Sequence, residues 1–115
     1  MSPMGNIPGF RTGVMFPVKP MKLFDAEVAV LNKIGNTAAL PPWPTVNVSG
    51  ITAGEEVQIQ VANDVKAPVW ADLGTPITAD GAYVLDTGAI LGRAKFAATG
   101  GGALVTVTLG GNPPG

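Results

Sequence analysis

Hydrophobic and polar residues alternate in short segments between about Thr45 and Leu109, and residues that favour turns separate these segments. The clearest segment runs from Glu55 to Val61, where Val or Ile alternates with Gln. A period of two is typical of an antiparallel strand with one face buried and the other in water. Because such strands recur at intervals of roughly eight to twelve residues, the pattern predicts an all-β fold, a compact antiparallel β-sandwich of jelly-roll or Ig-like type.

Turn residues and one ambiguous segment define the predicted connections. We expect Asp80-Gly81 to form a β-hairpin turn, Gly92 to bulge or bend a strand, and Gly100-Gly101-Gly102 to form a flexible turn. Residues 23–34 fit both a helical spacing and a strand alternation, and we favour a strand because the rest of the chain is β. Gly35-Asn36 would then be the following turn.

Residues 1–22 are predicted to form an extended arm in front of the sandwich domain, which spans residues 23–110 and is followed by a flexible tail at 111–115. Prolines in the arm prevent a continuous helix. The arm also carries large apolar side chains, which disordered linkers usually lack. We therefore expect it to lie on an apolar surface, either of its own domain or of a neighbouring molecule, through the anchors Ile7, Phe10, Phe16 and Met21.

The composition leaves few charges for the surface. Charged residues make up 13% of the chain, about half the usual share, and the formal net charge is -1. Some apolar surface should therefore stay exposed, and large exposed apolar patches usually mark contact sites. The scattered cations indicate no nucleic-acid partner, and no segment approaches the roughly 20 apolar residues that span a bilayer. The N-terminus also lacks the pattern of a secretion signal.

The chain contains no His and no Cys, which excludes the usual base at neutral pH, the common catalytic triads and zinc sites built on these residues. Carboxylates remain, and paired acids can hydrolyse glycosidic bonds. We expect Glu55 and Glu56 to face solvent at the start of a strand. The loop acids are expected to bond turn backbone, with a calcium site as the alternative; they are Asp64, Asp72, Asp80 and Asp86. The prediction is a protein that is not an enzyme and holds no metal or cofactor.

Three aromatic side chains stand out in the sequence. Trp70 and Tyr83 are expected to be core aromatics that anchor the two sheets, with a sugar-binding platform as the alternative. Trp43 lies in the stiff stretch Leu-Pro-Pro-Trp-Pro at residues 40–44. We expect this stretch to be a rigid connector that tucks the Trp43 ring against the core, and a ligand for a proline-recognition module is the alternative.

The order of features from Val61 to Leu109 resembles a pattern found in small virion proteins of tailed bacteriophages. A strand ends in Asn63-Asp64, and the later features are Trp70, Leu73-Gly74, Thr75-Pro76-Ile77-Thr78, Asp80-Gly81, Tyr83, Gly92-Arg93, a Gly-rich turn and Val105-Thr106-Val107-Thr108-Leu109. Those proteins often continue from Asn-Asp through Gly directly into Trp. Here Val65-Lys66-Ala67-Pro68 intervenes and lengthens that turn. The resemblance covers a little under half of the chain.

The resemblance implies a compact β-sandwich on the virion surface, where such proteins serve as capsid decoration (cement) proteins, head fibres, or modules of tail fibres and baseplates. We expect a decoration protein, made in the bacterial cytoplasm, that binds the major capsid protein on the outside of the head and self-associates as a trimer or dimer. Its charged contacts with the capsid would be Lys19, Lys22 and Arg93.

Two other hypotheses remain open at this point. The first is a receptor- or glycan-binding module of a head fibre, tail fibre or baseplate, which predicts an exposed Trp or Tyr beside Asp and Asn side chains. The second is a carboxylate-based hydrolase, which predicts two acids facing each other in a cleft.

Overall fold

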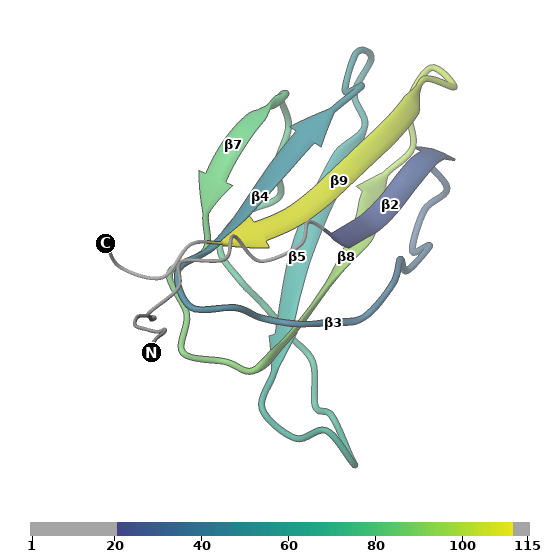
Figure 1. The fold of residues 1–115 in the computed structure, drawn as a ribbon. Helices are drawn as coiled ribbons and strands as arrows, with labels where there is room; N and C mark the ends of the chain where they lie inside the picture. Colours follow the sequence, from purple (N-terminus) through teal and green to yellow (C-terminus); the bar gives the residue numbers. More distant parts are fainter. Residues whose placement is uncertain (1–20, 112–115) are drawn as a thin grey trace, which may run out of the picture.

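The computed structural model describes residues 21–111, and all regular structure in these residues is β-strand (Figure 1). The predicted all-β class is therefore confirmed. The strands in chain order are β2 (Met21–Val28), β3 (Ala38–Ala39), β4 (Pro44–Ser49), β5 (Glu56–Ala62), β6 (Ala71–Asp72), β7 (Gly81–Val84), β8 (Leu91–Ala98) and β9 (Leu104–Gly111).

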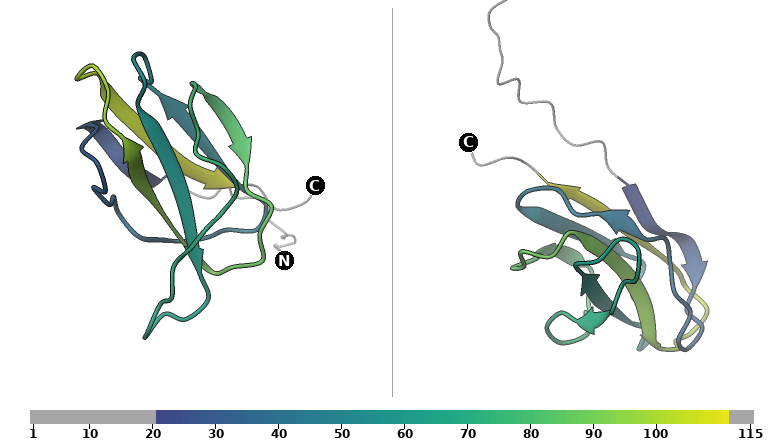
Figure 2. Two further views of the ribbon diagram at one scale, coloured as in Figure 1. Left: turned by 180° about the vertical axis from the view of Figure 1, so that it is seen from behind. Right: turned by 90° about the horizontal axis from the view of Figure 1, so that it is seen from below.

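The strands form two four-stranded sheets, with the orders β2-β9-β4-β7 and β3-β8-β5-β6. The strands pair in a nested order, from the outermost pair to the innermost: β2 with β9, β3 with β8, β4 with β7 and β5 with β6, always antiparallel. This is the connectivity of a double-sheet jelly roll, so it selects one of the two sandwich types that the sequence predicted. The two sheets face each other as layers (Figure 2).

A pair of stacked phenylalanines forms the centre of the core between the sheets. The ring centroids of Phe24 on β2 and Phe96 on β8 lie 4.2 Å apart, with an interplanar angle of 15°, and both side chains are buried. Trp70 and Tyr83 do not take this place. Tyr83 is partly buried and packs against the core, whereas Trp70 is half-buried and contacts Arg93. The prediction that Trp70 is a core aromatic was therefore wrong.

The predicted alternation is confirmed in β4 and β9. Val46 and Val48 are buried while Asn47 and Ser49 are exposed. β9 likewise buries Val105, Val107 and Leu109 at every second position, and its threonines lie between them. These two strands pair with each other at the centre of one sheet, so their inward rows make one continuous apolar surface.

β5 departs from the predicted pattern, because its glutamines are buried as well as its apolar residues. β6 and the two residues that follow it cover these glutamines. Gln58 donates from Nε2 to the carbonyl oxygens of Leu73 and Gly74 at 3.2 and 3.3 Å, and Gln60 donates to Asp72 Oδ1 at 2.9 Å. The two amides therefore attach that segment to the sheet and do not face water.

Residues 23–28 of the ambiguous segment belong to strand β2, as favoured, but this strand ends at Val28 and is irregular. Register shifts between Lys22 and Phe24 and between Phe24 and Glu27 place the consecutive residues Leu23 and Phe24 in the core. Gly35 does not form a turn. A Cβ on Gly35 would lie 2.1 Å from the backbone oxygen of Leu23, so this position requires glycine because the chain passes directly over β2.

Two further turn predictions were wrong. Gly81 begins β7, which pairs with β4 and not with the segment before it, so Asp80-Gly81 is not a hairpin turn. Asp80 instead accepts a hydrogen bond from the Ile51 amide at 2.8 Å. Gly92 lies in the regular part of the β5–β8 ladder, and its missing side chain makes room for Leu40, whose Cδ2 would lie 2.7 Å from a Cβ.

Replacing Phe96 with Ala should lower the free energy of unfolding by about 3–5 kcal/mol, because the change removes one ring of the central stack and leaves a cavity between the sheets. Urea titration of both proteins measures this loss. Phe96→Leu is the matched control and should cost clearly less, since it keeps most of the apolar volume. A loss below about 1 kcal/mol in the Ala variant would contradict the central position of the stack.

Candidate functional site

The residues predicted to contact a partner lie partly outside the described chain. Ile7, Phe10, Phe16 and Lys19 belong to residues 1–20, which the structure does not describe. The structure places the other two arm-end residues inside β2: Met21 pairs with Leu109 and Lys22 with Thr108. Lys22 forms an exposed ion pair with Asp25 at 3.2 Å, and a pair of this kind contributes little to stability.

Arg93 is held on the sheet by neighbouring side chains. Its Cζ lies 4.2 Å from the centroid of the Trp70 ring, and its Nε donates to Gln60 Oε1 at 2.9 Å. Partial burial lowers the pKa of the Arg93 guanidinium, although arginine remains protonated throughout the physiological range. The contact also covers Trp70, which leaves this ring unsuited to serve as an open platform for a sugar.

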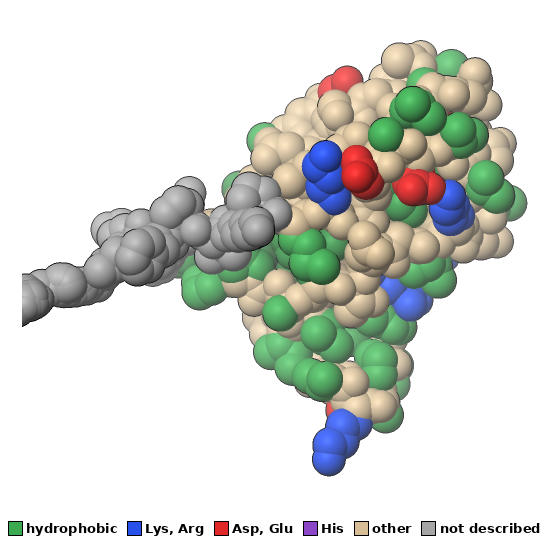
Figure 3. Space-filling view, turned by 45° about the vertical axis from the view of Figure 1, so that its right-hand side comes forward, with side chains coloured by type: hydrophobic (Ala, Val, Ile, Leu, Met, Phe, Trp, Pro, Cys, Tyr) green, Lys and Arg blue, Asp and Glu red, His purple; other side chains and the backbone are tan. Residues whose placement is uncertain are grey.

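The loop between β5 and β6 projects from the end of the sandwich and carries exposed aliphatic side chains. Val65 and Val69 are 69% and 83% exposed. Asp64 fixes the loop, because its carboxylate accepts hydrogen bonds from the amides of Lys66 and Ala67 at 2.9 and 3.2 Å. Hydrophobic side chains cover much of this projection (Figure 3). We call Val65 and Val69 the loop patch; the sequence indicated the turn but not this exposed surface.

A second group of exposed hydrophobic residues lies at the far end of β2. Val28 on β2 pairs with Leu104 on β9. Val30 and Leu31 follow Val28 in the chain, just beyond the end of the strand. All four members of this end patch are exposed: Val28, Val30, Leu31 and Leu104. Residues 23–34 were expected to form one strand, whereas β2 ends at Val28, so Val30 and Leu31 lie beyond the strand and are exposed.

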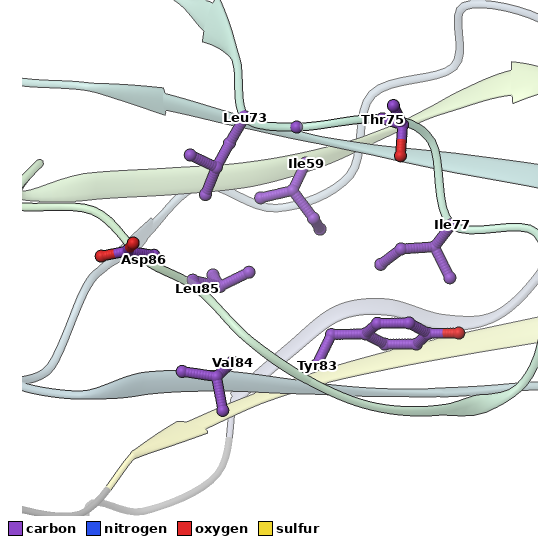
Figure 4. A pocket seen from close by; sticks show the side chains of 9 residues that line it. Ile59, Leu73, Thr75, Ile77, Tyr83, Val84, Leu85 and Asp86 are labelled. Carbon is purple, nitrogen blue, oxygen red and sulfur yellow. The ribbon is translucent and has the colours of Figure 1, made fainter.

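An apolar pocket of about 260 Å³ opens between β7 and the segment around residues 73–77 (Figure 4). Ile59, Leu73 and Ile77 face Tyr83 and Leu85 across it. The Tyr83 hydroxyl donates to the carbonyl of Ala79 at 2.6 Å, so this polar group is already satisfied. Asp86 is the one acid among the residues that line this pocket, whereas the geometry of a carboxylate hydrolase requires two facing acids.

Beside this pocket lies an open hollow lined by residues 42–44 and 84–88. Trp43 stands at its edge with 60% of its surface exposed, so the prediction that Trp43 is tucked against the core was wrong. The backbone of Trp43 has a φ of 52°, in the left-handed region that bulky residues rarely occupy. Asp86 and Thr87 line the same hollow.

Glu55 was expected to face solvent and is fully buried instead, with 0% exposure. Its carboxylate accepts hydrogen bonds from the amides of Thr52 and Ala53, each at 2.8 Å, and from Gly101 at 3.0 Å. The bonds from Ala53 and Thr52 are the main reason that the pKa of Glu55 is lowered. A single carboxylate thus joins the β4–β5 loop to the Gly-rich turn between β8 and β9.

Three of the four loop acids hold the structure together. Asp64 bonds the amides of its own turn, as the sequence predicted, whereas Asp80 accepts from the Ile51 amide on another loop and Asp72 accepts from Gln60. Within residues 21–111, no group of three acidic side chains comes together in a way that could hold a metal ion. The described part of the chain also contains no helix of the length and apolarity needed to cross a membrane.

Comparison with known proteins gives no relative on which to base a function. No protein-family model, no curated protein and no solved structure matches the chain.

Replacing Glu55 with Gln should destabilise the protein at neutral pH, because three backbone donors lose a charged acceptor. The folded-state pKa of Glu55 is lowered, so its stabilisation is present above about pH 4.3, the ordinary pKa of Glu, and is lost as pH falls through the folded-state pKa. The urea midpoints of wild type and variant should therefore converge in acid. Glu56→Gln removes the same charge without touching the three donors; an equal loss in both variants would contradict the assignment.

Proposed function

We propose that the chain is a non-enzymatic virion structural protein, a capsid decoration protein that binds the outer surface of a tailed-phage head. It would contact the major capsid protein and stabilise the shell across subunit boundaries. The single observation that supports this proposal best is the amount of large apolar surface that a small, charge-poor jelly roll leaves exposed. The loop patch and the end patch lie apart from each other on the fold.

Exposed aliphatic residues of this kind are costly in a free monomer and useful in an assembly. Burying apolar surface stabilises by roughly 25 cal/mol per Å², and contiguous exposed apolar patches usually mark interaction sites. Val65 and Val69 project on a loop that Asp64 holds in place, so little conformational entropy is lost when the loop meets a partner. Two separate patches allow one molecule to contact two neighbours, as a cement protein must.

The proposed mechanism is stabilisation by mass action. A protein that binds the assembled shell better than its separated subunits shifts the equilibrium toward the shell by RT ln(1 + [L]/Kd). The N-terminal arm, with Ile7, Phe10, Phe16 and Met21, would extend the contact to a neighbouring subunit. Unpaired edge strands such as β7 can accept an added strand in this kind of contact. Self-association as a trimer or dimer on the shell belongs to the same proposal.

The roles of the acids support the non-enzymatic part of the proposal. Glu55, Asp64 and Asp80 are engaged by backbone amides, and Asp72 by a buried glutamine. Catalytic acids need a facing partner and access to a substrate. The sequence supplies no His or Cys to take their place.

Charging the loop patch should weaken binding to undecorated heads of the phage that encodes the chain. We expect the double variant Val65→Asp/Val69→Asp to lose at least about tenfold in affinity, since two apolar contacts become desolvated charges. Co-sedimentation with the heads measures binding. Lys66→Gln, between the two valines, is the matched control and should bind within about threefold of wild type. Equal binding by all three proteins would remove the loop from the interface.

Deleting residues 1–20 tests the contribution of the arm, and the deletion leaves β2 complete. The shortened protein should keep its thermal midpoint and bind heads more weakly, because only contacts to the neighbouring subunit are lost. Undiminished binding would contradict the arm mechanism, and absence of binding by the full-length chain would contradict the decoration function itself.

A further inference from the structure

Trp43 combines two unfavourable properties in one residue. Its large ring is 60% exposed to water, and its backbone has a φ of 52°. Left-handed backbone is unfavourable for a bulky residue, and Gly or Asn would be favoured there for folding alone. Strained residues of this kind cluster at functional sites, so Trp43 needs an explanation beyond stability.

Backbone contacts on both sides hold Trp43 in place. Pro44 begins β4, is buried, and accepts a hydrogen bond from the Leu85 amide at 2.8 Å. On the other side, a Cβ on Gly111 would lie 2.9 Å from the Pro42 oxygen and 3.0 Å from the Trp43 oxygen, so β9 passes directly against this backbone. The flanking prolines limit rotation further. The ring is therefore presented from a rigid base, without being buried itself.

Polar groups lie beside the ring in the same hollow. Asp86 and Thr87 line it together with Trp43, and its volume of about 720 Å³ is within the usual range of small-molecule sites. Thr87 Oγ1 accepts a hydrogen bond from the Ala89 amide at 3.1 Å, which leaves its own hydrogen free to donate. Within residues 21–111, no ion pair engages the Asp86 carboxylate. The hollow thus combines an aromatic face, a strong acceptor and a donor.

We propose that this hollow is a carbohydrate-binding site and that Trp43 is its stacking platform. One face of a pyranose ring carries C–H groups that pack on an indole, while its edge carries hydroxyl groups that both donate and accept. The Asp86 carboxylate would accept from one hydroxyl and Thr87 would donate to its neighbour. Because the backbone already fixes the ring, binding would order little of the protein, which favours affinity for a small ligand.

The other aromatic candidates fit this role less well. The face of Trp70 is covered by the Arg93 guanidinium, and the Tyr83 ring is partly buried with its hydroxyl engaged by Ala79. Trp43 is the candidate that has both an open ring and unengaged polar neighbours. The inference is independent of the decoration function, since it concerns a different surface from the loop and end patches.

Intrinsic fluorescence can test the site, because the chain has only two tryptophans. In a Trp70→Phe background, Trp43 is the only tryptophan whose emission can report binding. The probes are tetrasaccharides of glucose, mannose, galactose and N-acetylglucosamine, titrated into the full-length protein. At least one should shift Trp43 emission to the blue with saturation. Adding Asp86→Asn should weaken that binding severalfold.

A second variant separates binding from folding and is read by calorimetry. Trp43→Asn suits the left-handed backbone but lacks the ring, so it should fold at least as stably as Trp43→Phe while losing binding by more than tenfold. Trp43→Phe should retain weaker binding. Val69→Ala, on the loop patch, should bind as wild type. The proposal is overturned if none of the tetrasaccharides binds, if Trp43→Asn binds normally, or if Trp43 responds only to a synthetic peptide of residues 5–20.

Discussion

The contact between Phe24 and Phe96 determines much of the surrounding structure, because it joins an edge strand of one sheet to a central strand of the other. The pairing of β2 with β9 is irregular on both sides of Phe24, and this irregularity places Phe24 in the stack. The chain then passes close over the pair and bonds the second sheet: Gly35 donates to Ala94, and Phe96 donates to Lys33. The irregular strand and the glycine crossing are thus both consequences of one aromatic contact.

The sequence predicted those strands whose burial depends on their own alternation. β4 and β9 have one face toward the core and one toward water, so the pattern of apolar residues contains the answer. The alternation pattern predicted the wrong exposure for Gln58 and Gln60, because a segment more than ten residues later covers them. No local pattern in the sequence contains that information. Glu55 was misjudged for a related reason: its partner Gly101 is 46 residues away in the chain.

The same distinction applies to the candidate surfaces: some of their properties follow from the composition, and others depend on the tertiary structure. Absence of His and Cys, and the excess of apolar over charged residues, could be read directly from the composition. The positions of the exposed residues could not, because exposure depends on which segment lies over which. Trp43 and Trp70 illustrate the difference. The Trp43 ring was expected to pack against the core and is exposed to water instead. The Trp70 ring was expected in the core and lies against the Arg93 guanidinium instead.

The pairing of β2 with β9 has a consequence for how the protein is made. The Ala26 amide donates to Thr106 Oγ1, 80 residues further along the chain, and the rest of the β2–β9 ladder is equally distant in sequence. Contacts of such separation fold slowly, since a long loop must close before any strand pairing is gained. A ribosome-bound chain that lacks β9 leaves both β2 and β4 without their shared neighbour. The first sheet can therefore close only after β9 has been synthesised, and until then its unpaired strand edges are exposed to aggregation.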